Sequence, residues 1–366
     1  QGAARSGWPQ PPRPCAGRRR GPGAAPRPSR AERRLRSTIS TFRPFPGNFI
    51  LSHYHADHYN GLVAASRKTS YAGSWSSLRA AFGPGLPQFP DRRPLYHALF
   101  ALNRYLLGDA SGLMELDFLD ALRRLAGREG FQYHRLFQGD DFRIGDNDLH
   151  CIWPPRNLHE EELGGRIDRA LTAFHHALQV DERLAKIYDR IANDHSLMDI
   201  LDIDETGEYV PGYMAELTAR TYGQETPDRS PVRRADVNPS EPGNAGQAEA
   251  IPREILDASN KLRAVANALS LAFVHGDRLL FLGDVARGQL RHVVRYLEEL
   301  ELSDFKVMVA AHHGSIWSSS LKQLRAETTV VSHGPRLASK YRPEYRTISG
   351  QVLSTHLSGD IRLDLS

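Results

Sequence analysis

The chain has 366 residues, of which 40% are hydrophobic and 25% charged, a balance typical of a folded protein with one large domain or more. No apolar run approaches the roughly 20 residues that cross a bilayer, so the sequence predicts no membrane span. Two cysteines, Cys15 and Cys151, are too few for a disulfide framework or a cysteine-rich zinc site, and we expect a reducing, cytoplasmic location.

The net positive charge of the chain comes from its N-terminal tail. Residues 1–46 hold eleven Arg, no Lys and one acid, Glu32, a net charge of +10. Subtracting this from the overall +4 leaves −6 for residues 47–366. The charge balance by itself therefore does not indicate a nucleic-acid groove on the folded part. Residues 1–37, mostly Pro, Gly, Ala and Arg, are predicted to be disordered.

Four metal-capable side chains follow a short apolar run near the start of the folded part. The run 49–51 is predicted to be a strand, and His53, His55, Asp57 and His58 come directly after it. Side chains alternate along a strand, so His53 and His55 leave its end on the same side. Imidazoles with a carboxylate suit zinc, or manganese and iron where oxygen ligands predominate. We interpret this stretch as a metal site and not as a His-rich surface turn.

The next hundred residues mix helical and strand patterns. We expect a helix to open at 61–66, a strand at 69–72, and helices within 93–127, where apolar residues have helical spacing. A β-rich patch follows, in which Gly/Asp turns separate short strands and so suggest hairpins. Its predicted strands are 135–137, 142–144 and 149–153.

A helical insertion is predicted in the middle of the chain. Ile167, Leu171, Phe174 and Leu178 step by four, three and four, which favours a long helix over 160–201. Residues 222–250 are rich in Pro, Asn, Ser, Gly and Glu and are expected to be a flexible connector. The predicted organisation is a tail (1–37), the first part of a domain (38–156), a helical insertion with a linker (157–254) and the second part of the domain (255–366).

In the second part, polar residues repeatedly follow strands. A hairpin of 268–274 and 277–282 is predicted to turn at His275-Gly276 and to lead into Gly283-Asp284 and a helix over 286–302. Two further strands and their polar ends are 305–310 with His312-His313-Gly314-Ser315, and 328–331 with Ser332-His333. Segments 351–354 and 361–365 close the chain. Loops held by rigid strands are where sites are built, so we expect a site at these strand ends.

Together these residues resemble the metallo-β-lactamase superfamily. The motif His53-x-His55-x-Asp57-His58, with Gly61 after it, carries the resemblance. The later segments look most like the hydrolase domain of the ComEC competence proteins and its stand-alone relatives. These segments are Gly139-Asp140 with Trp153-Pro-Pro, Asn267-x-x-Ser270-Leu, Leu282-Gly-Asp284, His312-His313-Gly314-Ser315, Ser332 with Tyr341-Arg-Pro343, and Ser354-Thr with Gly359-Asp-Ile. The matches cover most of residues 48–366 outside the insertion.

The resemblance implies an α/β fold of the αββα sandwich type, with two divalent metal ions, zinc or manganese, between the sheet edges. It implies that one metal is bound by His53 and His55, the other by Asp57 and His58, and that Asp284 bridges both. His313 is the expected remaining ligand, with His312 as the alternative. Asn267 stands where most of the superfamily has a third histidine, so we expect one metal to be held more loosely, or the site to prefer manganese.

The resemblance also implies hydrolysis. Two cations near a shared water lower its pKa from about 15.7 toward about 7, which yields hydroxide at neutral pH. Asp57, Asp284 and His313 are the expected catalytic residues, and the expected substrate-binding residues are Asn267, Ser315, Ser332 and His333. A phosphodiester such as single-stranded nucleic acid or a nucleotide is the favoured substrate. The alternatives are an acyl-ester or lactone hydrolase, and a non-catalytic metal-stabilised module of a defence or signalling complex that binds a protein partner through the insertion.

Overall fold

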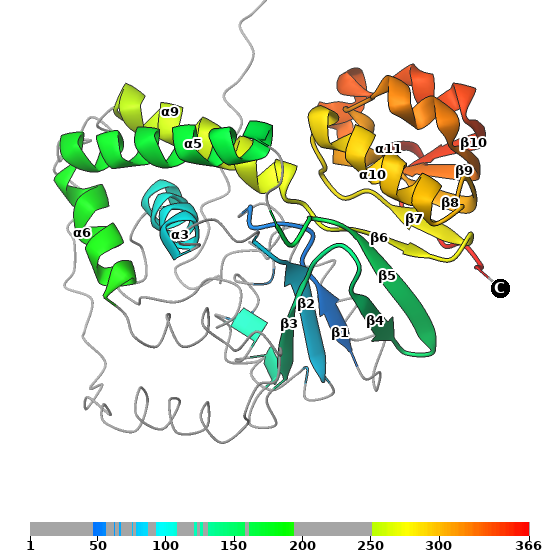
Figure 1. Ribbon diagram of the computed structural model, residues 1–366, viewed down its shortest axis with the longest axis horizontal. Helices are drawn as coiled ribbons and strands as arrows, with labels where there is room; N and C mark the ends of the chain where they lie inside the picture. Colours follow the sequence, from blue (N-terminus) through cyan, green and yellow to red (C-terminus); the bar gives the residue numbers. More distant parts are fainter. Residues whose placement is uncertain are drawn as a thin grey trace, which may run out of the picture.

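The structure is a computed structural model, and it describes residues 47–55, 62, 66, 75, 78–86, 93–107, 121–122, 125–126, 131–157, 161–193 and 251–365. Helices are combined with parallel and antiparallel strands, which confirms an α/β fold. Figure 1 shows two groups of strands, with helices α3, α5, α6 and α9 gathered on one side and α10 and α11 on the other. The strand predicted at 69–72 lies outside the described residues, whereas Leu62 and Ser66 are helical as expected.

The smaller sheet holds the segment that leads into the histidine motif. Its three strands are parallel, in the order β1 (Asn48–Ile50), β2 (Ala80–Pro84) and β3 (Gln132–Leu136). β1 confirms the strand predicted before the motif. The backbone N–H of Leu51 donates to the carbonyl of Phe82 at 2.8 Å, so pairing continues one residue past β1. The residues that follow therefore leave from the carboxyl edge of this sheet.

The larger sheet has seven described strands, in the order β10-β9-β8-β7-β6-β5-β4. They are β4 (Asp141–Ile144), β5 (Asn147–Trp153), β6 (Ala272–His275), β7 (Leu279–Phe281), β8 (Asp304–Val309), β9 (Arg325–Val331) and β10 (Ser349–Ser354). Strands β7 to β10 are parallel, while β4 to β7 alternate in direction. The carboxyl ends of parallel strands lie at one edge of a sheet, so the polar segments after β7, β8 and β9 come together there.

Two strand predictions need correction. The β-rich patch forms only one hairpin, β4–β5, because β3 pairs with β2 in the other sheet. Sequence pattern identifies a strand but not its partner, and β3 pairs with the edge of β2 that β1 leaves free. In addition, the strand predicted to start at residue 268 starts at Ala272, because residue 268 is the last residue of helix α9 (Arg253–Ala268). Of the two segments that close the chain, 351–354 lies within β10, and 361–365 has no regular secondary structure.

The single long helix predicted over 160–201 is broken. The described part consists of α5 (Glu161–Val180) and α6 (Glu182–Ala192), and residues 194–201 lie outside the description. Asp181 interrupts the helix in an extended conformation, and its carboxylate accepts the N–H of Leu184 at 2.7 Å. Asp is a favourable N-cap residue, so it ends one helix and starts the next. The helices α3 (Arg93–Leu107), α10 (Arg287–Glu299) and α11 (Thr355–Ser358) complete the set, and none of the described helices is long and apolar enough to cross a bilayer.

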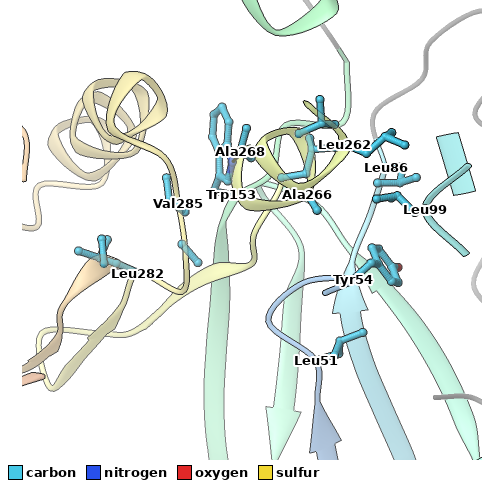
Figure 2. Packing of buried hydrophobic residues seen from close by; sticks show 14 of the residues in the cluster. Leu51, Tyr54, Leu86, Leu99, Trp153, Leu262, Ala266, Ala268, Leu282 and Val285 are labelled. Atoms are coloured by element: carbon cyan, nitrogen blue, oxygen red, sulfur yellow. Dashed lines mark hydrogen bonds between the residues drawn. The ribbon is translucent and has the colours of Figure 1, made fainter. Parts of the chain in front are cut away.

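Helix α9, which the strand-centred interpretation of the sequence missed, links the helical layer to the sheets. It packs against α5 (Figure 1), and Ile255, Ala258 and Leu262 are buried at helical spacing. At its C-terminal end the buried indole of Trp153 donates to the carbonyl of Ala268 at 2.7 Å, and Figure 2 shows these two residues side by side. This anchoring fixes the last turn of α9, which carries one of the predicted site residues.

Candidate metal centre

Imidazoles from two separate segments surround one carboxylate oxygen of Asp284. Oδ2 of this residue lies 4.0 Å from Nε2 of His53, 3.7 Å from Nδ1 of His312 and 3.6 Å from Nε2 of His313. His53 follows β1 of the smaller sheet, Asp284 follows β7, and the histidine pair follows β8 of the larger sheet. The structure therefore brings together three segments that are far apart in sequence, at the adjoining edges of the two sheets.

His53 and His55 form the deepest part of this centre. Their side chains lie together, as alternation along a strand predicts, with Nε2 of His53 2.9 Å from Nδ1 of His55. Both are buried, His53 completely and His55 to 6% exposure. Buried imidazoles in contact with each other and with a carboxylate are typical of ligand sets for transition metals. The other two motif residues, Asp57 and His58, lie outside the described residues.

The turn that presents Asp284 is tied to both sheets. The hydroxyl of Ser270 accepts the N–H of Asp284 at 2.8 Å and donates to the carbonyl of Ser52 at 3.2 Å. The N–H of His312 donates to the carbonyl of Gly283 at 2.8 Å. Ser270 thus connects the segment before His53 to the Asp284 turn. Sequence reasoning included Ser270 in a motif but assigned it no role, because a single serine within a predicted strand has no distinctive signal of its own.

His312 and His313 have a strained backbone. Their φ angles are +48° and +58°, in the left-handed region that costs a non-glycine residue roughly 1 kcal/mol or more. Tyr345, fully buried, holds the loop from both sides: its hydroxyl accepts the N–H of Ala311 at 3.1 Å and donates to the carbonyl of Ile316 at 2.7 Å. Such strain persists only where the surroundings impose it, and here it turns both imidazoles toward Asp284.

A backbone carbonyl sets the orientation of His313. Its Nδ1 lies 2.8 Å from the carbonyl oxygen of Ser332, so Nδ1–H donates there and the neutral ring keeps its lone pair on Nε2, the atom that faces Asp284. This arrangement is typical of metal-ligating histidines. Ser332 has an exposed side chain, and Ser315 donates its hydroxyl to the carbonyl of His312 at 2.7 Å. Both predicted substrate-binding serines therefore border the centre.

The two remaining predicted residues differ in position. Asn267, in the last turn of α9, places Nδ2 3.5 Å from Nδ1 of His312, and its buried Oδ1 accepts no hydrogen bond within the described part of the chain. His333 contacts a different group: Nε2 lies 3.2 Å from the hydroxyl of Ser354, and Nδ1 lies 3.2 Å from the carbonyl of Gly334. Asn267 therefore belongs to the centre, whereas His333 lies beside β10.

The donors suit a divalent metal in chemistry, and their spacing is wider than a bound ion requires. Tetrahedral ligands about 2.1 Å from zinc are roughly 3.4 Å apart, and the three nitrogens lie only slightly farther than this from Oδ2 of Asp284. The buried Oδ1 of Asn267 adds an oxygen donor of the kind that manganese accepts. As they stand, no three His, Cys, Asp or Glu side chains of the described ranges are grouped closely enough to enclose an ion. The centre as predicted also includes Asp57 and His58.

Tyr54, between the two motif histidines, supports the motif from behind. Its hydroxyl donates to the carbonyl of Pro84 at 2.8 Å and contacts the hydroxyls of Tyr133 at 3.0 Å and Tyr96 at 3.3 Å. Burial, together with these two neighbouring phenols, raises the pKa of Tyr54 well above its ordinary value, so the hydroxyl stays protonated. The residue was missed because a tyrosine within a histidine motif does not show from sequence which way it points.

Replacement of Tyr54 by Phe is expected to lower the free energy of unfolding by about 2 kcal/mol, because the buried carbonyl of Pro84 and the hydroxyls of Tyr96 and Tyr133 would lose a partner. Urea unfolding followed by circular dichroism measures this. The partly exposed Tyr296, whose hydroxyl contacts His150, is the control, and its change to Phe should cost roughly 0.5 kcal/mol. Equal effects of the two changes would contradict the supporting role of Tyr54.

Comparison with known proteins supplies no relative. The chain matches no protein-family model, no curated protein and no solved structure. A function for this centre therefore has to be argued from its own residues.

Proposed function

We propose that the chain is a metal-dependent hydrolase with an αββα fold of the metallo-β-lactamase type, acting on phosphodiesters. The observation that supports this best is the convergence of His53, His312 and His313 on one oxygen of Asp284, from segments at the edges of two different sheets. A fold needs no such arrangement for its stability, since buried histidines and a carboxylate are costly to desolvate.

The proposed ligands divide into two sets that share Asp284. His53 and His55 would hold one divalent ion, Asp57 and His58 the other, with His313 as the remaining ligand. When bound, zinc or manganese would polarise the scissile group and lower the pKa of an attacking water. Asp284 would keep the two ions together, and the carbonyl of Ser332 would keep Nε2 of His313 free of a proton.

The test is hydrolysis of an end-labelled single-stranded DNA by the full chain after chelation, with manganese or zinc added back. We expect cleavage only with metal. A His53→Ala variant should lose it, while His176→Ala, at an exposed position of α5, should retain it. An aryl ester and a lactone are assayed in parallel, and bound metal is measured by mass spectrometry.

Each outcome decides between the candidate functions. Metal-dependent DNA cleavage that is lost with His53 supports the phosphodiesterase. Cleavage of ester or lactone alone, with metal bound, moves the assignment to acyl hydrolysis by the same centre. If metal binds and no substrate is cleaved, the hydrolase proposal is replaced by that of a metal-stabilised interaction module. If the chain binds no metal, the whole proposal fails.

A further inference from the structure

Arg342 is attached to the loop that carries the histidine pair. Its backbone N–H donates to the carbonyl of Gly314 at 2.9 Å, and its Nε–H donates to the carbonyl of Ser315 at 3.2 Å. The preceding residue lies against the same loop, because a Cβ placed on Gly314 would come within 3.4 Å of Cδ2 of Tyr341. Two hydrogen bonds therefore place the guanidinium immediately beyond His313, at the rim of the candidate metal centre.

The rest of this guanidinium is available to a ligand. Its Nε is engaged with Ser315, the side chain is exposed, and within the described ranges no carboxylate forms an ion pair with Arg342. A guanidinium with its Nη groups directed to solvent is well suited to bidentate recognition of a phosphate. Two other exposed arginines, by contrast, are engaged by carboxylates: Arg143 pairs with Asp148, and Arg156 pairs with Asp140.

The positive charge of Arg342 contrasts with the negative net charge of residues 47–366. Residues 47–366 carry a net charge of −6, which includes the buried carboxylate of Asp284, so their net charge disfavours the approach of a polyanion. A cation at the rim would attract an anionic substrate before it reaches the metal ions proposed for the centre. Arg342 is a cation fixed at such a position by its backbone and its own Nε.

We propose that Arg342 binds a phosphate group of the substrate and so sets the preference for single-stranded nucleic acid over neutral esters. This inference rests on the proposed function. It assigns Arg342 to substrate binding, and leaves bond cleavage to the residues around Asp284.

Arg325 offers a matched control. It too is exposed, and its Nη1 donates to the carbonyls of Lys322 at 2.7 Å and Leu324 at 2.8 Å. It starts β9, whose other end leads to Ser332, so a strand of seven residues places it roughly 20 Å from the centre. Substituting Arg325 removes the same charge and a similar backbone contact without touching the rim.

The experiment measures binding of a fluorescein-labelled oligothymidylate by anisotropy in a chelator, over a series of salt concentrations, and then steady-state kinetics with metal restored. In Arg342→Gln we expect affinity to fall about tenfold and the slope of log affinity against log salt to fall by about 0.7, the value for one phosphate contact on a single strand. Arg342→Lys should keep the slope and recover part of the affinity. KM should rise while kcat changes little.

Arg325→Gln should match the wild type in affinity, slope and KM, and thermal unfolding of each variant checks that the loop is intact. If the wild type cleaves DNA and Arg342→Gln behaves as Arg325→Gln does, this inference is overturned and the phosphodiesterase proposal stands. If the wild type neither binds nor cleaves the oligonucleotide, both fall. Loss of kcat in Arg342→Gln with unchanged salt slope would also overturn the inference, because it would indicate a role in holding the loop.

Discussion

Asp284→Asn is expected to lower kcat/KM of the metal-dependent reaction by at least about 100-fold and to reduce bound metal. Groups that only orient a metal ligand contribute about 10–100-fold to metal affinity or activity, so a carboxylate that we propose binds both ions should contribute more. Asn has nearly the shape of Asp but no charge, and Oδ2 of Asp284 is the atom on which His53 and His313 converge. The prediction is checked by steady-state kinetics together with metal content by mass spectrometry.

The control for this change is a residue that flanks the same strand, β7. Asp277 is exposed in the turn that leads into β7, at the opposite end from Asp284. Asp277→Asn should leave activity and metal content within about twofold of the wild type, because surface substitutions away from special features have small effects. An Asp284→Asn protein with full metal content and full activity would remove this residue from the centre.

The second large effect is expected at Gly283, where Ala should destabilise the fold by roughly 3 kcal/mol or more. Its φ is +50°, and a Cβ there would lie 2.4 Å from the carbonyl oxygen of Leu271 and 2.7 Å from Oγ of Ser270. The backbone carbonyl cannot move aside, since Leu271 itself is paired through its N–H with Ser52. A steric clash in a packed region is therefore added to the cost of the left-handed conformation.

Gly276 isolates the conformational part of that cost. It also has φ of +50°, but a Cβ at this turn position would meet nothing within 4 Å. Gly276→Ala should therefore cost only about 1 kcal/mol, the penalty of the left-handed region alone. Urea unfolding of both variants measures the difference. If the two changes destabilise equally, the close approach between the Asp284 turn and residues 270–271 is not what constrains position 283.

Local pattern was sufficient for the elements that surround the centre. The apolar runs before His53, Asp284 and His312 predict strands, and β1, β7 and β8 are found there. Alternation along a strand also predicts that His53 and His55 lie together. These features depend on residues within a few positions of one another, so the sequence contains the information directly.

Partners distant in the chain could not be predicted in the same way. The assignment of β3 to the smaller sheet depends on the edge that β2 offers, and Asp181, where α5 ends, accepts the hydroxyl of the distant Tyr105 at 2.7 Å. Helix α9, which was not predicted, has regular apolar spacing. Because a hairpin was predicted directly after it, residues 268–271 were wrongly assigned to the first strand of that hairpin. For β3 and for the break at Asp181, contacts between distant residues accompany the conformation that local pattern did not predict.

The sequence by itself determined the chemistry available to this protein: an imidazole and carboxylate set at strand ends, and the strands that carry it. Only the tertiary structure decided which of those side chains meet. It turned His313 toward Asp284 through the carbonyl of Ser332, and it placed Arg342 beside Ser315 while leaving His333 against Ser354. The reason is that a residue type specifies what a group can bind, whereas its neighbours come from sheet pairing and strained loops that only the complete fold stabilises.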